Sequence, residues 1–142
     1  MFFDLDKWVG HITEIAMKQI SDAFSRRLQN TGVTRIQWIA LYYVKLNKVI
    51  SQRELSNLMN VKDSSAGRLI DRLERDGLIE RERNDQDRRI IYIKLTKKGD
   101  DLITEILPYG EKFNCDLING IDEEDLIIFD KVLKKMISNV SE

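Results

Sequence analysis

The sequence predicts a mainly α-helical protein with one small β-hairpin. Apolar residues recur every three or four positions over most of the 142 residues, which is the spacing of one helix face. A two-residue alternation is confined to residues 89–95, which is the spacing of a half-buried strand. With 42% apolar and 33% charged residues, the chain has the composition of a soluble globular protein with a buried core.

The first predicted helix is long, because apolar positions at three- and four-residue spacing extend over residues 5–28. The polar sequence at 30–32 ends it. A second helix, about 35–47, begins with a capping box in which the side chains of Thr34 and Gln37 satisfy free backbone amides. It is apolar nearly all round, so we expect it to be the buried centre of the domain.

Two short helices follow. The first begins with a capping pattern at Ser51 and ends near Asn60. After a connection of about three residues, either Asp63 or Ser64 caps the second. Gly77 is suited to the left-handed conformation that ends helices, so the second helix should stop there.

A two-stranded hairpin is expected next, with strands at 79–83 and 89–95 joined by a polar turn at 84–87. In the second strand, alternation places Ile91, Ile93 and Leu95 on one face. Two strands alone are marginal in water, so this hairpin must pack against helices.

The last third of the chain is helical by pattern. Pro108 lies inside one apolar periodicity, where it should kink or interrupt the helix. Four acidic residues, 122–125, begin the final helix, where the macrodipole favours negative charge. This helix carries a stripe spaced like two heptads of a helix–helix interface, which predicts dimerisation through Leu126, Phe129, Leu133, Met136 and Val140.

Charge is divided unevenly along the chain. The net charge is −1, but residues 1–98 carry 19 Lys/Arg against 13 Asp/Glu, whereas residues 99–142 carry 4 against 11. The acidic C-terminal segment therefore offsets a net positive charge on residues 1–98, and the net charge of the whole chain says little about binding partners.

Several function classes are disfavoured. The longest apolar run, residues 38–44, is far shorter than the roughly 18–20 residues that span a bilayer, and acidic residues stand where a signal peptide carries positive charge. We therefore expect a cytoplasmic protein without a membrane partner. The chain has one cysteine, one histidine and no Gly-rich phosphate loop, and no nucleophile–base pair is visible. We expect no metal, no cofactor and no enzymatic activity.

The order of two short helices, a tight turn and a hairpin with a basic tip is that of a winged helix-turn-helix, whose second helix enters the major groove of DNA. Candidate DNA contacts are Ser64, Ser65, Arg68 and Arg72 on that helix and Arg88 and Arg89 on the wing. Other readings stay open. The serines can be helix caps, Arg68 and Arg72 can pair with Asp71, Glu74 or Asp76, and the wing arginines can simply face water.

This region resembles the MarR family of bacterial transcription regulators. The similarity lies in LSNLMNVKDSSAGRLIDRLERDG, residues 55–77, and in NDQDRRIIYIKLTKKG, residues 84–99. The family's wing pattern is present as Asp87, Arg89, Ile93, Leu95, Thr96 and Gly99.

The resemblance implies a homodimer in which the first and last helices of both chains interlock. It also implies repression at a pseudo-palindromic DNA site, commonly relieved by small aromatic or phenolic ligands. On that pattern Arg89 enters the minor groove and Asp87 holds the shape of the wing. The DNA-binding domain would be residues 34–99, and the dimerisation region residues 1–33 and 100–142.

Two alternatives remain at this point: an oxidant-responsive regulator acting through Cys115, and a winged domain that contacts only proteins. An effector pocket is a further hypothesis, since aromatic residues near the dimer helices could line one, although aromatics at helical spacing are more often core. Its candidate residues are Trp8, His11, Trp38 and Tyr42.

Overall fold

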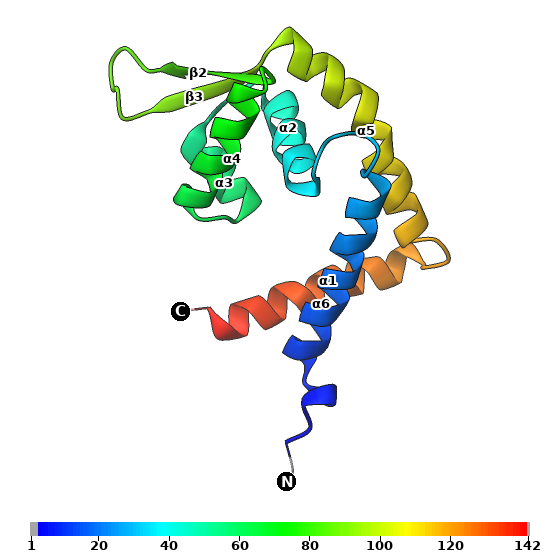
Figure 1. Cartoon of the computed structure of the whole chain (residues 1–142). Helices are drawn as coiled ribbons and strands as arrows, with labels where there is room; N and C mark the ends of the chain where they lie inside the picture. The colour runs from blue at the N-terminus through cyan, green and yellow to red at the C-terminus, as the bar shows by residue number, and fades with distance from the viewer. Residues whose placement is uncertain (1–2, 142) are drawn as a thin grey trace. The chain divides into compact units, whose positions relative to one another are not determined.

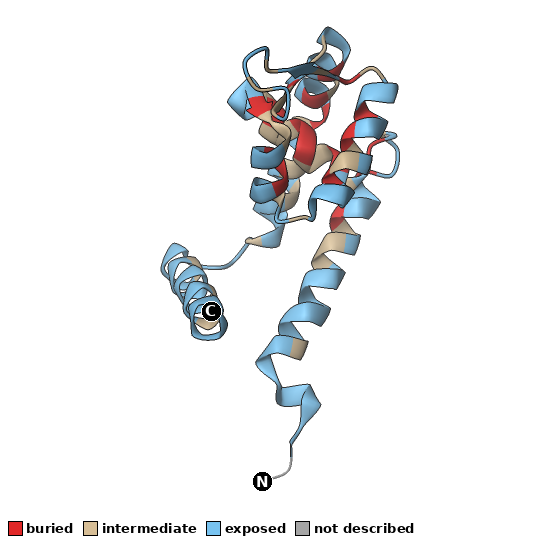
Figure 2. Ribbon diagram, turned by 90° about the vertical axis from the view of Figure 1, so that its left-hand side faces the viewer, coloured by how far each residue is buried: buried red, intermediate tan, exposed pale blue. Residues whose placement is uncertain are grey.

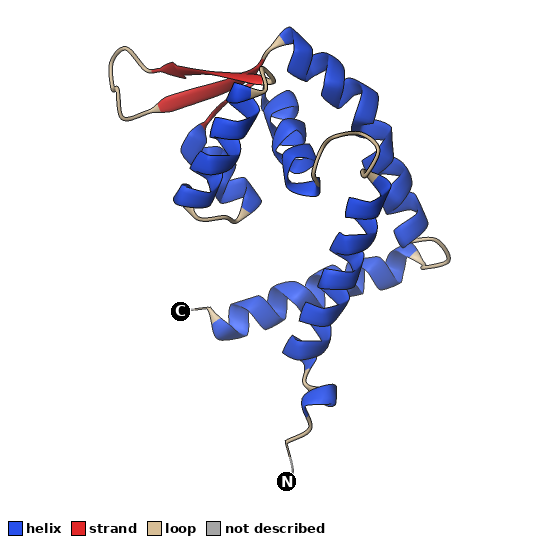
Figure 3. Ribbon diagram, in the orientation of Figure 1, coloured by secondary structure: helices blue, strands red, loops and turns tan. Residues whose placement is uncertain are grey.

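A computed structural model describes residues 3–141 of the chain. Over this range the chain forms six α-helices, a short 3-10 helix and one three-stranded antiparallel sheet (Figures 1 and 3). This confirms the predicted fold class. The chain divides into two compact units, Met1–Glu111 and Lys112–Glu142, which are described separately below.

The N-terminal helix differs from the prediction. The chain forms a 3-10 turn at Leu5–Lys7, and α1 begins only afterwards, at Val9–Arg27. Two local features break the expected single helix: the Asp4 side chain accepts the Asp6 amide, and Trp8 takes an extended backbone conformation. Within α1 only Phe24 is buried, so most of its apolar face is exposed.

Helix α2, Arg35–Asn47, is the buried centre of the winged part, residues 33–106, whose buried side chains form one core, as predicted. The amide of Gln37 donates to the Thr34 hydroxyl at 3.2 Å, and the amide of Thr34 donates to the Gln37 carboxamide at 3.0 Å. This capping box fixes the start of the helix. Three of its apolar residues are completely buried: Ala40, Leu41 and Val44. In Figure 2 the buried residues are gathered where the helices pack together beside the sheet.

Helices α3, Gln52–Met59, and α4, Asp63–Arg75, form the helix-turn-helix. The Ser51 hydroxyl accepts the Glu54 amide at 3.0 Å, as the capping pattern predicted, and Asn60 ends α3 in the left-handed conformation. The predicted cap of α4 is wrong, because Lys62 occupies the cap position and makes no side-chain bond there. Asp63 instead accepts a hydrogen bond from the buried Ser56 hydroxyl at 2.9 Å, which ties α4 to α3.

The sheet contains β1 (Val49–Ser51), β2 (Ile79–Arg83) and β3 (Ile91–Leu95) in the order β1-β3-β2. The predicted two-stranded hairpin is therefore incomplete, since β1 pairs with the other edge of β3. The last strand also begins two residues later than predicted. Residues 89 and 90 belong to the turn, which is closed by a bond from the Ile90 amide to the Asp87 carbonyl. As expected, Ile93 is fully buried.

Two residues of the wing pattern have a structural explanation at the start of α5, Lys97–Leu117. The Thr96 hydroxyl accepts the Gly99 amide at 3.0 Å and donates to the Gly77 carbonyl. A Cβ at position 99 would clash with the Leu78 carbonyl oxygen, so no larger side chain fits there. The threonine and the glycine thus fasten α5 onto the junction between α4 and β2.

Helix α5 is continuous through Pro108, so of the predicted kink or interruption the interruption is wrong. A proline removes one backbone donor, and the remaining bonds of a 21-residue helix are sufficient to continue it. Trp38 packs against α5 two residues before and two residues after the proline: its indole donates to the Ile106 carbonyl at 3.0 Å, and its ring occupies the space that a Cβ at Gly110 would need.

The second unit contains α6, Glu123–Val140. Its first turn carries Glu123, Glu124 and Asp125, as predicted for a helix N-terminus. No residue of α6 is buried, and Figure 2 shows the helix mostly exposed, with no part in the buried colour. Over residues 3–141 no helix is long and apolar enough to cross a membrane.

Candidate nucleic-acid interface

Helix α4 buries one face and exposes another. Ala66, Ile70 and Leu73 are buried in the core. The four residues predicted to contact DNA from this helix are all exposed: Ser64, Ser65, Arg68 and Arg72. Because the core residues fix the rotation of the helix, its two serines and two arginines are presented to solvent from a rigid support.

Arg68 and Arg72 form no ion pair with any residue in the described range. The carboxylates considered as their partners have other contacts, since Asp71 and Glu74 face Arg81 of β2 and Asp76 faces Arg75. The two guanidinium groups therefore keep all their donors for an external acceptor.

The wing tip is ordered by its own side chains. Asn84 accepts the amides of Gln86 and Asp87, at 2.8 and 3.2 Å. Arg83 donates to the Arg88 carbonyl at 2.8 Å, so the backbone at the tip is held while the Arg88 side chain stays exposed. The β2–β3 hairpin projects from the helices in Figure 1.

Asp87 and Arg89 form a closed pair at the base of this tip. Both carboxylate oxygens of Asp87 accept from the Arg89 guanidinium at 3.0 Å, and one also accepts the Arg89 amide at 3.1 Å. The guanidinium, and then the amide, hold the pKa of Asp87 below its ordinary value, and the carboxylate raises the pKa of Arg89. The Arg89 side chain is nevertheless 91% exposed, so it is positioned without being withdrawn from solvent.

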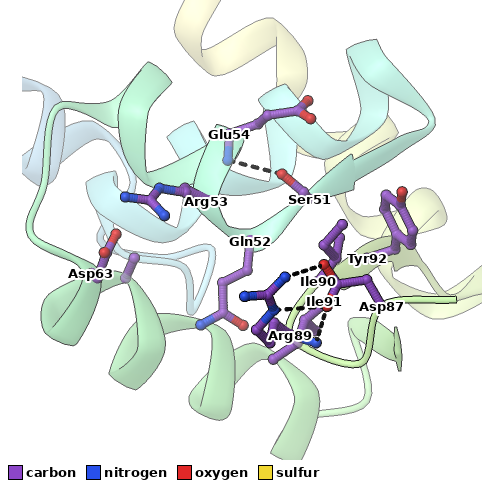
Figure 4. Close-up of a pocket in the computed structure, with 11 residues that line it drawn as sticks. Ser51, Gln52, Arg53, Glu54, Asp63, Asp87, Arg89, Ile90, Ile91 and Tyr92 are labelled. Carbon is purple, nitrogen blue, oxygen red and sulfur yellow. Dashed lines mark hydrogen bonds and ion pairs between the residues drawn. The ribbon is translucent and has the colours of Figure 1, made fainter. Parts of the chain in front are cut away.

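A hollow of about 570 Å³ lies between the start of α3, the start of α4 and the base of the wing. Figure 4 shows Arg89 extending from the wing toward Gln52 of α3 across this space. Arg53 and Gln52 line the hollow beside the wing. The sequence analysis did not single out these two residues, although their place in the first turn of the first short helix was a usable signal.

The proposed effector residues are not gathered within one chain. Trp38 and Tyr42 stack with ring centres 5.7 Å apart, and Phe24 meets the Trp38 ring edge-on. His11 lies thirteen residues before Phe24 on α1, which is about 20 Å along a helix. Trp8 lies just before the helix begins, and its ring contacts Phe3. The aromatic pair on α2 and the two N-terminal residues are thus separate groups.

The stripe predicted for dimerisation lies on the exposed surface of α6. Phe129 and Val140 are exposed, and Leu126, Leu133 and Met136 are partly exposed. The sequence analysis missed three more exposed apolar residues that flank the stripe: Ile128, Val132 and Ile137. At 100° per residue the combined set covers about half of the helix circumference.

Cys115 is an exposed free thiol on α5. Residues 3–141 contain no group of three or more His, Cys, Asp or Glu side chains that could hold a metal ion. Within that range the Cys115 thiol is therefore not part of such a metal-binding group.

Comparison with known proteins gives concordant results. Residues 31–90 match the model of a family described as the MarR family. The chain is 27% identical over 133 residues to an uncharacterized HTH-type transcriptional regulator, YsmB of Bacillus subtilis, covering 94% of this chain and 88% of that protein.

Two solved structures share the fold. A mutant MarR from E. coli complexed with operator DNA superposes with a TM-score of 0.81 at 22% identity, covering 91% of this chain and 93% of that one. BpsR of Bordetella bronchiseptica, whose DNA binding is regulated by 6-hydroxynicotinic acid, gives a TM-score of 0.87 at 19% identity and covers both chains completely, at 100%.

Proposed function

Because the chain belongs to the MarR family of winged helix-turn-helix transcription regulators, we propose that it is a homodimeric repressor of a pseudo-palindromic DNA operator, released by a small aromatic or phenolic ligand. Residues 34–99 would be its DNA-binding domain. Residues 1–33 and 100–142 would form the dimerisation region.

One observation carries the DNA-binding part of the proposal: α4 presents two arginines without ion-pair partners in the described range, on the face opposite its buried residues. An α-helix fits the major groove of B-DNA, and an arginine there can donate two hydrogen bonds to one guanine, worth about 1–3 kcal/mol of discrimination. Arg68 lies in the first half of α4, near the end that meets base edges in such complexes. Ser64 and Ser65 precede it on the same exposed surface.

The wing supports the same proposal. Asp87 holds Arg89 in one orientation, which lowers the conformational entropy that a minor-groove contact would cost. Arg88 extends from a backbone that Arg83 already holds, so it either meets a phosphate or faces water.

Dimerisation is supported by the apolar surface of α6. A helix with half of its circumference apolar and no buried residue is not stable alone in water, and contiguous apolar surface of this kind marks association sites. A second copy of the chain would cover it symmetrically. The two winged parts would then meet half-sites about one helical turn, roughly 10 base pairs, apart.

Ligand control is supported by one structural relative and by the aromatic side chains of α2. BpsR, which shares the fold, responds to an aromatic acid. In this chain Trp38 and Tyr42 offer an aromatic surface, and Trp8 and His11 can join it only from a second copy. We therefore place the effector pocket at the dimer interface.

A band-shift titration with the DNA upstream of the chain's own gene tests the main proposal. We expect binding that weakens steeply with salt, because phosphate contacts release counterions. Addition of 6-hydroxynicotinic acid and a panel of phenolic acids tests release. Absence of salt-sensitive binding would reject the regulator described here, whereas binding that no aromatic acid affects would reject only the ligand control.

A further inference from the structure

Arg81 lies in the middle of β2, opposite the fully buried Ile93 of β3. Its side chain is 23% exposed and reaches from the sheet to α4. One terminal nitrogen donates to the Gly67 carbonyl at 3.4 Å and to the Asp71 carboxylate. The other lies 3.9 Å from the Glu74 carboxylate. A single guanidinium thus meets one stripe of α4.

That stripe adjoins the arginines proposed to read DNA. Asp71 lies three residues after Arg68 and four before Arg75, which is the spacing at which Asp and Arg pair on a helix surface. The sequence alone would therefore allow Asp71 to capture Arg68. In the structure Asp71 pairs with Arg81 instead, and Arg68 has no ion pair with any described residue.

The pair between Arg81 and Asp71 affects charge more than stability. Asp71 is 68% exposed, so solvent screens its side of the pair with the 23% exposed Arg81 and reduces what the pair adds to folding. The same exposure places its negative charge on the solvent side of α4, three residues after Arg68 and four before Arg75, and charges closer than the Debye length of about 8 Å are incompletely screened. A phosphate approaching α4 would be repelled by an uncompensated carboxylate at this position.

We propose that Arg81 is a positioning residue for DNA recognition that acts by neutralising Asp71 and Glu74. It occupies the two carboxylates from the sheet side, leaves Arg68 free and removes a repulsive charge from the reading helix. Arg81 itself does not contact DNA. The inference rests on the proposed function, since it takes α4 to be the helix that enters the groove.

The test is a set of variants assayed for binding to the same DNA. Arg81→Gln should weaken DNA binding about three- to tenfold, because it leaves the negative charges of Asp71 and Glu74 uncompensated. Adding Asp71→Asn should restore binding to within about twofold of wild type, and Arg81→Lys should keep most of it. The matched control is Arg81→Gln with Glu82→Gln, which has the same net charge but leaves Asp71 in place, and it should not restore binding.

Asp71→Asn alone separates neutralisation from mechanical clamping. If Arg81 serves only to clamp α4 to the sheet, removing Asp71 should also weaken binding, by less than removing Arg81, because Arg81 keeps its contacts with the Gly67 carbonyl and Glu74. If neutralisation is its role, Asp71→Asn should bind at least as well as wild type. Weaker binding by Asp71→Asn than by wild type, or a double variant as weak as Arg81→Gln, would overturn the proposal. The single Asp71 variant decides the matter even if Arg81→Gln does not fold.

Elution from immobilised heparin extends the test to a polyanion other than DNA. Arg81→Gln should elute at lower salt than wild type, and only the Asp71→Asn combination should recover the wild-type position. If the wild-type chain shifts no DNA, the proposed function fails. The heparin series still tests whether Arg81 neutralises the carboxylates of Asp71 and Glu74. Identical elution of wild type and Arg81→Gln would reject it.

Discussion

Helices α4 and α6 have similar apolar periodicity, but α4 buries its apolar residues within the chain and α6 does not. In α4 the apolar residues Ala66, Ile70 and Leu73 are buried against α2, α3 and the sheet. In α6 a wider apolar face has no buried residue. Periodicity predicts that a helix has an apolar face, but it does not say whether the surface that covers it belongs to the same chain.

This difference in burial separates a part of the chain that should be stable on its own from helices that should depend on association. The winged part builds its core from residues that are distant in sequence, such as Ile50, Ile93 and Ile103, which are all buried. The first half of α1 and all of α6 expose their apolar residues in a single chain. The winged part should therefore fold by itself, whereas these helices should gain stability only through association.

The largest effect is expected from Ile93→Ala, in the centre of the sheet. Deleting most of a fully buried isoleucine side chain costs about 2–5 kcal/mol of unfolding free energy, from lost burial and the cavity left behind. Urea denaturation at fixed protein concentration measures it. Ile127→Ala, at an exposed position on α6, is the control and should change the unfolding free energy by less than about 0.5 kcal/mol. Equal losses in the two variants would remove the distinction drawn here.

The second prediction concerns association. Leu133→Glu should convert a dimer to a monomer by light scattering, since a carboxylate buried without a partner in an apolar interface costs several kcal/mol, equivalent to about a hundredfold or more in the dissociation constant. Lys134→Glu, on the polar side of the same helix, should remain dimeric. Circular dichroism should show a folded winged part in both. A dimeric Leu133→Glu would mean that α6 is not the interface.

The fold was predictable wherever local chemistry decides it. Thr34 and Gln37 define the start of α2, and Gly77, at φ +74°, ends the second short helix as its residue type suggests. Strand β1 could not be predicted, because three residues are too few to show an alternation and only pairing with β3 makes them a strand. The break at Trp8 was hidden because its apolar side chain continues the helical pattern.

The candidate site was predictable to a similar degree. The exposure of Arg68 and Arg72 followed from their place opposite the apolar face of α4. The contact between Arg81 and Asp71 could not be foreseen, since it joins a strand to a helix ten residues away and depends on how the two pack. The N-terminal and α2 aromatic residues looked like one group in sequence and are separate in one chain.

The third prediction sharpens the contrast between folding and function inside the winged part. Arg89→Ala should weaken DNA binding about tenfold, because it would remove the minor-groove contact proposed for the side chain that Asp87 holds. Its thermal midpoint should stay within about 2 °C of wild type, since the side chain is almost fully exposed. Arg88→Ala is the control, with a smaller loss expected, because Arg83 holds only its carbonyl. A large fall in the midpoint of Arg89→Ala would make the residue a folding determinant.

The smallest effect should come from the pH dependence of the Asp87–Arg89 pair. Arg89 lowers the pKa of Asp87 from its ordinary value of 3.8, so the folded carboxyl holds its proton less tightly than the unfolded one. Its stabilising contribution is then complete above the unfolded pKa and is lost as pH falls through the lowered folded pKa. The thermal midpoints of wild type and Asp87→Asn should accordingly differ slightly near neutral pH and converge in acid below pH 3.8. Asp85→Asn, in the same turn, controls for the loss of one charge. A difference that persists in acid would show that Asp87 shapes the wing without its charge, and that the tip, like the core, is held by packing.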